Sequence, residues 1–196
     1  MTKQNKKLEK GLIQIFIGDG RGKTTAAMGT AIRAAGHGLR VAVFQFLKGG
    51  GFTGEFLALK KLGNIQIYQY GPTGPSKKYT KSVKEGKARV GREYFIYTKK
   101  DIEKERRGLK LAEKKISSGK YDLVVLDELI DLIWFKHATE NEIVKVLNKK
   151  HPKTEVILTG HIKPAKILRM AEYISEVKKI RHPFDKKIQA RWGIDY

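Results

Sequence analysis

Residues 13–25, with the sequence IQIFIGDGRGKTT, constrain the fold of this chain more than any other stretch. The stretch opens with mostly β-branched and aromatic residues, which favour a strand, and continues with glycines that let the backbone turn sharply. Lys23, Thr24 and Thr25 then begin a helical pattern. A strand, a glycine-rich loop and a helix in this order predict a phosphate-binding loop, in which backbone N–H groups and the positive end of the helix converge on anionic oxygens. A glycine-rich turn that binds no ligand is the alternative.

The positions of this loop have expected roles. Lys23 can reach the terminal phosphates of a nucleotide, and Thr24 can bind a magnesium ion. The loop is shorter than the common pattern, because the pattern's first glycine would fall on Ile17 and the nearest glycine is Gly18. The strand before it and the helix after it are nevertheless the context that the motif requires. The expected ATP-binding residues of the loop are Gly18, Asp19, Gly20, Arg21, Gly22, Lys23, Thr24 and Thr25.

The length and the composition set the outer limits. A chain of 196 residues is expected to form one domain, residues 1–196, which buries roughly 70% of the surface of its unfolded form. It contains no cysteine, so no disulfide or thiolate metal site contributes, which fits a reducing, cytoplasmic compartment. The basic segment 1–10 lacks an apolar core, and no apolar run approaches the ~20 residues of a membrane span. We expect a soluble protein that is not exported.

The net charge of +21, from 41 Lys and Arg against 20 Asp and Glu, predicts an anionic ligand or a strongly basic surface. Three explanations fit this charge: a nucleoside triphosphate, a nucleic acid, or a solvated lysine-rich surface of the kind that heat-adapted proteins carry. The lysines are spread along the chain instead of being concentrated in one tail or helix. This distribution favours the solvated surface over nucleic-acid binding.

Apolar strand patterns alternate with helical patterns along the chain. This alternation predicts an α/β fold with a mostly parallel sheet covered by helices on both faces. The expected strands are residues 12–17, 40–46, 65–70, 121–126, 155–159 and 174–180. The expected helices are residues 23–35, 55–62, 101–118, 129–135, 140–148 and 164–171, and the buried face of the third consists of Ile102, Leu109, Ala112 and Ile116. Residues 71–100 are basic and interrupted by Gly and Pro, which predicts a long loop that acts as a lid or an insertion.

Two adjacent carboxylates, Asp127 and Glu128, follow the apolar strand 121–126. In a parallel sheet they lie at the edge that also carries the phosphate loop. Carboxylates beside phosphates are the hard oxygen ligands that Mg²⁺ binds directly or through water. Adjacent acids also serve as helix caps, but Lys23 and Thr24 favour a magnesium–nucleotide site with Thr24, Asp127 and Glu128 as metal ligands. Since the second acid activates water in many ATPases, hydrolysis and group transfer both remain open.

Blocks spanning residues 18–196 carry a resemblance to a known family. In chain order they are GDGRGKTTAAMGTAIRAAGHG, VAVFQFLKG, DLVVLDEL, VILTG and RHPFDKKIQARWGIDY. Together they resemble the P-loop type of ATP:corrinoid adenosyltransferase, the enzyme of cobalamin biosynthesis and salvage, with its RecA-like P-loop NTPase fold. The loop followed by RAAGHG and the C-terminal GIDY are more specific than a bare nucleotide motif, and the family shares the short loop.

The resemblance implies transfer of the 5′-deoxyadenosyl group of ATP to the Co(I) centre of cob(I)alamin or cob(I)yrinic acid a,c-diamide, with release of tripolyphosphate. The family binds ATP in reversed orientation along its loop, so that C5′ of the ribose faces the corrinoid. Cobalt is then the nucleophile, and the protein has to neutralise the leaving triphosphate and align the two substrates. The resemblance implies Mg²⁺ as cofactor, Lys23, Thr24 and Glu128 as catalytic residues, and Arg33, Gln45 and Lys48 as further ATP-binding residues.

Two positions depart from the family pattern. Asp19 stands where relatives commonly carry Asn and adds a negative charge beside the phosphates, which Arg21 or Mg²⁺ has to offset. After the strand 65–70, relatives carry a Gly-Phe-x-Trp stretch whose rings press on the lower face of the corrinoid, but this chain has GPTGP. Phe95 and Tyr97 have the same one-residue gap ahead of the next helix, so they are the expected corrinoid-binding residues. The alternative is that both are ordinary core aromatics.

The resemblance also implies partners: ATP, a corrinoid, a reductant such as a flavoprotein, and a second copy of the chain in a homodimer. No membrane partner is expected. A RecA-like P-loop ATPase that acts with nucleic acid and a kinase for a small substrate are the alternative functions. No arginine-rich recognition helix or aromatic-rich basic patch supports the first alternative, and no glycine or arginine lid of familiar type supports the second.

Overall fold

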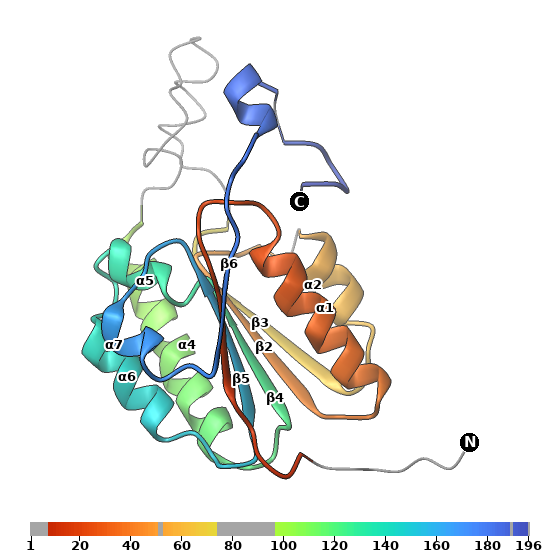
Figure 1. Cartoon of the computed structure of the whole chain (residues 1–196), viewed down its shortest axis with the longest axis vertical. Helices are drawn as coiled ribbons and strands as arrows, with labels where there is room; N and C mark the ends of the chain where they lie inside the picture. Colours follow the sequence, from red (N-terminus) through yellow and green to blue (C-terminus); the bar gives the residue numbers. More distant parts are fainter. Residues whose placement is uncertain (1–7, 51–52, 74–96, 189, 196) are drawn as a thin grey trace.

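A parallel six-stranded sheet forms the centre of the protein in the computed structural model, which describes residues 8–50, 53–73, 97–188 and 190–195. The strand order is β3-β2-β4-β5-β1-β6, and each neighbouring pair runs parallel (Figure 1). The predicted α/β fold is therefore confirmed. The strands are β1 (Ile13–Ile17), β2 (Val41–Phe46), β3 (Ile65–Tyr70), β4 (Leu123–Asp127), β5 (Glu155–Gly160) and β6 (Tyr173–Glu176).

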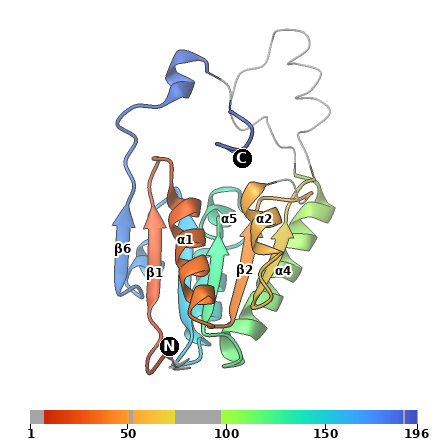
Figure 2. The ribbon, with the colours of Figure 1, turned by 90° about the vertical axis from the view of Figure 1, so that its right-hand side faces the viewer.

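Helices cover both faces of this sheet, as predicted. Two of them, α1 and α2, lie on one face, and the other α-helices lie on the opposite side (Figure 1, Figure 2). None of the helices in the described part of the chain is both long and apolar enough to cross a membrane. The helices are α1 (Lys23–Gly36), α2 (Gly54–Leu59), α4 (Lys99–Ser117), α5 (Asp131–Trp134), α6 (Glu140–Asn148), α7 (Ala165–Leu168) and the 3₁₀ helix η1 (Pro183–Lys186).

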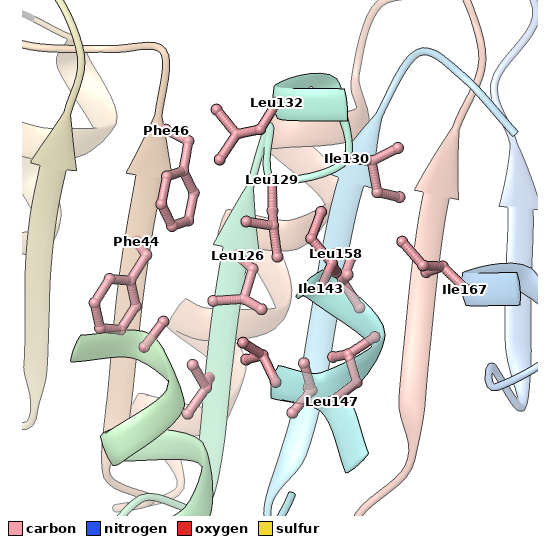
Figure 3. Packing of buried hydrophobic residues seen from close by; sticks show 14 of the residues in the cluster. Phe44, Phe46, Leu126, Leu129, Ile130, Leu132, Ile143, Leu147, Leu158 and Ile167 are labelled. Carbon is pink, nitrogen blue, oxygen red and sulfur yellow. The ribbon is translucent and has the colours of Figure 1, made fainter. Parts of the chain in front are cut away.

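The two central strands β2 and β4 are buried along their whole length. Their sequences, VAVFQF and LVVLD, are nearly continuous apolar runs, because each face of these strands packs against helices. Phe44 and Phe46 are fully buried and point toward α4 and the neighbouring apolar cluster (Figure 3). Each such side chain contributes about 2 kcal/mol of burial free energy. The polar residues at the ends of these runs, Gln45 and Asp127, are equally buried.

Three elements are shorter than predicted by three residues or more. The strand expected at residues 174–180 ends at Glu176, because its partner Ile17 is the last residue of β1 before the chain turns into the glycine loop. The helices expected at residues 129–135 and 164–171 are the single turns α5 and α7. The apolar patterns therefore overestimated the lengths of β6, α5 and α7.

The buried face of α4 differs in part from the predicted one. Ala112 and Ile116 are fully buried as predicted, but Ile102 and Leu109 are only half-buried. An acidic residue, Glu105, takes an inner position and is 1% exposed. The prediction was wrong here because it assigned only apolar residues to the inner face, whereas this position has a buried polar partner on another element.

That partner is His137, which follows α5. Its Nδ1 lies 2.5 Å from Oε2 of Glu105, and both side chains are buried. Burial raises the pKa of Glu105 to about 8 and lowers the pKa of His137. Both shifts favour the neutral forms, so the Glu105 carboxyl donates its proton in a hydrogen bond to the imidazole nitrogen.

We predict that this pair makes the free energy of unfolding depend on pH. The folded pKa of Glu105 lies above its unfolded value, so its stabilising contribution is complete at low pH and is lost as the pH rises toward about 8. Between about pH 5 and pH 8 the wild type should lose on the order of 2 kcal/mol relative to Glu105→Gln, measured by urea unfolding. Glu113→Gln, on the same helix but in an exposed pair with Lys149, is the control and should follow the wild type. A constant difference between wild type and Glu105→Gln across this range would contradict the neutral pair.

Candidate nucleotide site

The predicted phosphate loop connects β1 to α1. Gly18 and Gly22 have φ angles of 110° and 116°, which residues with a Cβ rarely adopt. A Cβ on Gly18 would lie 2.4 Å from the carbonyl oxygen of Val177, and one on Gly20 would lie 2.8 Å from the same atom. The glycines are therefore required both for the turn and for the close approach of the segment that follows β6.

Lys23 begins α1 and points back into the loop. Its Nζ donates a hydrogen bond to the carbonyl oxygen of Gly20 at 2.8 Å, and the side chain is buried. Burial lowers the pKa of Lys23. Thr25 is exposed, and Arg33 is exposed in the last turn of α1, about 15 Å along the helix axis from Lys23. The structure thus keeps Lys23 at the loop and does not bring Arg33 to it.

Asp127, at the end of β4, is the centre of a buried hydrogen-bond network. Its Oδ1 accepts from the hydroxyl groups of Thr24 at 2.9 Å and Thr159 at 2.8 Å. Its Oδ2 accepts from Lys48 at 2.7 Å and Gln45 at 3.3 Å. Burial alone would raise the pKa of Asp127, but the charge of Lys48 together with the hydrogen bonds from Lys48, Thr159 and Thr24 outweighs burial and holds this pKa below its ordinary value. Four separate segments therefore meet at one ionised carboxylate.

Glu128 completes this edge of the sheet. Its backbone N–H donates to the Thr159 hydroxyl at 2.8 Å, and its Oε1 lies 3.3 Å from Nζ of Lys48. Glu128 and Leu47, at the ends of neighbouring strands, both have φ near 58°, a conformation that is uncommon for residues with a Cβ. Burial raises the pKa of Glu128. Burial lowers the pKa of Lys48, but the carboxylates of Glu128 and Asp127 outweigh burial and hold it above its ordinary value.

Several residues of this edge were not identified from the sequence. Thr159 is the last residue but one of β5, next to β4. Gln69 of β3 donates to Oε1 of Gln45 in β2 at 2.9 Å. The rule that ligand-side residues lie at the carboxyl ends of parallel strands could have found Thr159. Asp131 and His161 also meet here, with His161 Nδ1 2.8 Å from Oδ2 of Asp131. No local pattern pairs these two residues, because they lie on different elements.

The C-terminal segment supplies partners to the charged residues of the loop. Oδ1 of Asp19 accepts from the backbone N–H of Lys179 at 3.0 Å, and this hydrogen bond lowers the pKa of Asp19. Arg21 forms an ion pair with Asp195 at 2.9 Å and donates to the carbonyl oxygen of Ile194. The backbone N–H of Lys179 thus stabilises the negative charge of Asp19, whereas Arg21 pairs with Asp195.

Of the two expected corrinoid-binding residues, Phe95 lies outside the described residues, as does most of the predicted lid. Tyr97 is half-buried ahead of α4, with its ring 4.7 Å from that of His137 and 5.1 Å from that of Phe135. Burial raises the pKa of Tyr97. Phe135 in turn lies 6.1 Å from Trp134, so Tyr97 belongs to a group of aromatic rings around α5.

We predict that Lys48→Met lowers the free energy of unfolding by about 3 kcal/mol, because it leaves the buried carboxylate of Asp127 without its cation. Urea unfolding near neutral pH measures this loss. The control is Lys163→Met, which breaks an exposed pair with Glu176 of similar length, 2.9 Å, and should cost less than about 1 kcal/mol. Equal losses in the two variants would show that the Lys48 pair behaves as a surface ion pair.

A solved structure shares this architecture. A KaiC-like protein from the hyperthermophilic archaeon Pyrococcus horikoshii OT3 matches with a TM-score of 0.50 and 16% sequence identity, over 86% of this chain and 73% of that one. At this identity the likeness concerns the fold alone. It supports the predicted RecA-like P-loop fold.

The sequence comparisons concern the family. The model described as ATP:corrinoid adenosyltransferase BtuR/CobO/CobP matches residues 9–196. The corrinoid adenosyltransferase of Escherichia coli strain K12 is 34% identical over 189 residues, which cover 96% of this chain and 87% of that protein. Corrinoid adenosyltransferase CobA of Salmonella typhimurium strain LT2 is 33% identical over 188 residues, with the same coverage of both chains. This chain therefore belongs to the ATP:corrinoid adenosyltransferase family.

Proposed function

We propose that this protein transfers the 5′-deoxyadenosyl group of ATP to the Co(I) centre of a corrinoid and releases tripolyphosphate. The family match supports ATP-dependent adenosylation of corrinoids, and it does not favour the alternative of an ATPase that acts with nucleic acid. Cob(I)alamin and cob(I)yrinic acid a,c-diamide are the two acceptors that we propose. A flavoprotein that delivers electrons to cobalt and a homodimeric assembly belong to the same proposal, by analogy with the family.

One observation favours group transfer over hydrolysis: Lys48 lies within 3.3 Å of both carboxylates at the end of β4. Hydrolysis of ATP needs a group that accepts a proton from water. The pKa of Asp127 is held below its ordinary value, which makes this carboxylate a weak base, and all its hydrogen bonds lie inside the protein. Attack by cobalt needs no base, because Co(I) already carries the electron pair that forms the new bond.

The loop residues act on the leaving group. As the Co–C5′ bond forms, the C5′–O bond breaks and its electron pair passes to the triphosphate. Lys23 and the N–H groups at the start of α1 would neutralise this charge, since Lys23 lies at the loop and the positive end of the helix begins there. The main task of the protein is then to hold C5′ in line with cobalt.

Magnesium fits the donor set at the loop. The Thr24 hydroxyl donates a hydrogen bond to Asp127 and accepts a long one, 3.5 Å, from Lys48, so a lone pair of its oxygen remains for a metal. Thr24 and Glu128 would hold the ion directly, and Asp127 would act through water because its oxygens already accept four hydrogen bonds. The described residues contain no group of three or more His, Asp or Glu placed to hold a metal, and Mg²⁺ commonly uses one or two protein ligands plus phosphate oxygens. When bound, the ion neutralises charge on the phosphates.

We predict that intact tripolyphosphate appears in step with adenosylated corrinoid. The reason is that C5′, and not a phosphorus atom, is the electrophile. Phosphorus NMR of an anaerobic reaction with ATP, Mg²⁺ and chemically generated cob(I)alamin measures both products. Lys23→Ala is the matched variant, and it should lower turnover by about a hundredfold or more while the protein stays folded. ADP and orthophosphate as the main products would contradict adenosyl transfer.

A second prediction concerns Phe95 and Tyr97, which we propose cover the lower face of the corrinoid. If they exclude the axial ligand, the cobalt is four-coordinate and easier to reduce. The double replacement by alanine should slow adenosylation from Co(II) substrate by about tenfold or more, leave the rate from preformed Co(I) within about threefold, and leave ATP affinity within about threefold.

Single variants separate this role from a core role. Tyr97 packs on His137 and Phe135, so Tyr97→Ala alone should lower the free energy of unfolding by about 2 kcal/mol. Phe95→Ala is compared with it, and its free energy of unfolding is measured beside its activity from Co(II) substrate. An unfolded double variant would support the core role, and full activity from Co(II) would place the corrinoid platform elsewhere, around Tyr70 or Tyr79.

A further inference from the structure

A buried carboxylate holds an exposed histidine at the ligand edge of the sheet. The Oδ1 atom of Asp131 accepts from the backbone N–H of His161 at 2.7 Å, and its Oδ2 lies 2.8 Å from Nδ1 of the same residue. The Asp131 side chain is 3% exposed, whereas that of His161 is 45% exposed. Both oxygens of the carboxylate therefore contact one residue, whose ring reaches the surface.

The contacts define how the ring of His161 is presented. Because a carboxylate only accepts hydrogen bonds, Nδ1 carries a proton, and Nε2 is the nitrogen on the side away from Asp131. The ring of Trp134 lies 6.2 Å away in an edge-to-face arrangement, which restricts its rotation further. A histidine oriented by a buried acid in this way is typical of residues that contact a ligand.

The pair lies beside the phosphate loop. His161 directly follows β5, and Gly160 is paired in register with Ile17, the last residue before the loop. The connections that leave β1 and β5 are at the same end of the sheet (Figure 1). Burial lowers the pKa of Lys23, and the negative charge of Asp131 is the strongest influence that opposes this lowering. Asp131 thus lies near Lys23 on one side and His161 on the other.

A purely structural role explains only half of these contacts. The bond from Oδ1 to the backbone N–H is sufficient to hold the chain after β5 against α5. The second bond also gives a defined direction to an exposed imidazole. A triphosphate on the loop carries several negative charges. In the imidazolium form both ring nitrogens donate, so Nδ1–H faces Asp131 and Nε2–H is available to a phosphate oxygen.

We propose that His161 contacts the triphosphate of ATP and the departing tripolyphosphate through Nε2–H, and that Asp131 is the positioning residue that sets the ring direction. This inference rests on the proposed adenosyl transfer. When the C5′–O bond breaks, its electron pair passes to the phosphate chain, and the hydrogen bond from His161 strengthens as the charge grows. This step requires no proton transfer. Lys23 and His161 would then hold the leaving group from two directions.

The test measures the affinity for tripolyphosphate itself. Calorimetric titration of magnesium tripolyphosphate, without corrinoid, compares wild type with His161→Asn and Asp131→Asn. We expect His161→Asn to weaken binding by about tenfold or more, since a charge-assisted hydrogen bond is lost. Asp131→Asn should weaken it by about threefold or more while its own side chain stays out of contact with the phosphates. His37→Asn, at the opposite end of α1, is the control and should bind as the wild type does.

Nitrogen NMR of histidine-labelled protein supplies a readout that does not depend on activity. Addition of tripolyphosphate should shift the Nε2 resonance of His161 and leave that of His37 unchanged. If Asp131→Asn fails to fold, the His161→Asn titration and the NMR shift decide the question. An unchanged tripolyphosphate affinity in folded His161→Asn would overturn the inference.

Cobalt is the competing ligand for this imidazole. Nitrogen splitting in the EPR spectrum of bound Co(II) corrinoid that disappears in His161→Asn would also overturn the inference, because it would identify His161 as an axial ligand. These outcomes are separate from the proposed function. A wild type that forms ADP in place of tripolyphosphate contradicts the adenosyl transfer, whereas a normal wild type with an unaffected His161→Asn contradicts only the role of His161.

Discussion

The buried carboxylate of Asp127 is the constraint on which the ligand edge of this protein depends. It is fully buried, so its charge is tolerable only because Lys48 neutralises it and the hydroxyls of Thr24 and Thr159 donate to it. These donors come from the start of α1, the segment after β2 and the end of β5. One ionised group therefore fixes the phosphate loop relative to the central strands.

Close approach of backbones fixes the other side of the loop. Gly18 and Gly20 lie against the chain at Val177, and Arg21 reaches Asp195 near the end of the sequence. The glycines thus serve two needs at once: they allow the turn from β1 into α1, and they leave room for the segment after β6. The family resemblance of the C-terminal GIDY stretch has a physical counterpart here, because this stretch supplies the partner of Arg21.

The acidic residues matter more to this site than the excess of basic ones. The chain has a net charge of +21, yet Asp127 and Asp131 are nearly inaccessible and each is used to place other groups. Asp127 orients Thr24 and Lys48, and Asp131 orients His161. In a low-dielectric edge such fixed carboxylates hold donors in the geometry that an anionic ligand requires, whereas exposed lysines contribute mainly a diffuse positive field.

The sequence by itself determined the phosphate loop, the parallel sheet and the family, because glycine spacing, apolar runs and alternating periods are local features that tertiary contacts rarely reverse. It also brought Lys23, Thr24 and Asp127 to one edge, since parallel strands place their carboxyl ends together. Only the tertiary structure decided that Thr159 and Lys48 complete the Asp127 network, that Glu105 replaces an apolar residue inside α4, and that Asp131 holds His161. These pairs join residues far apart in the chain, so they depend on strand register and helix packing, and β6 ends where β1 turns away for the same reason.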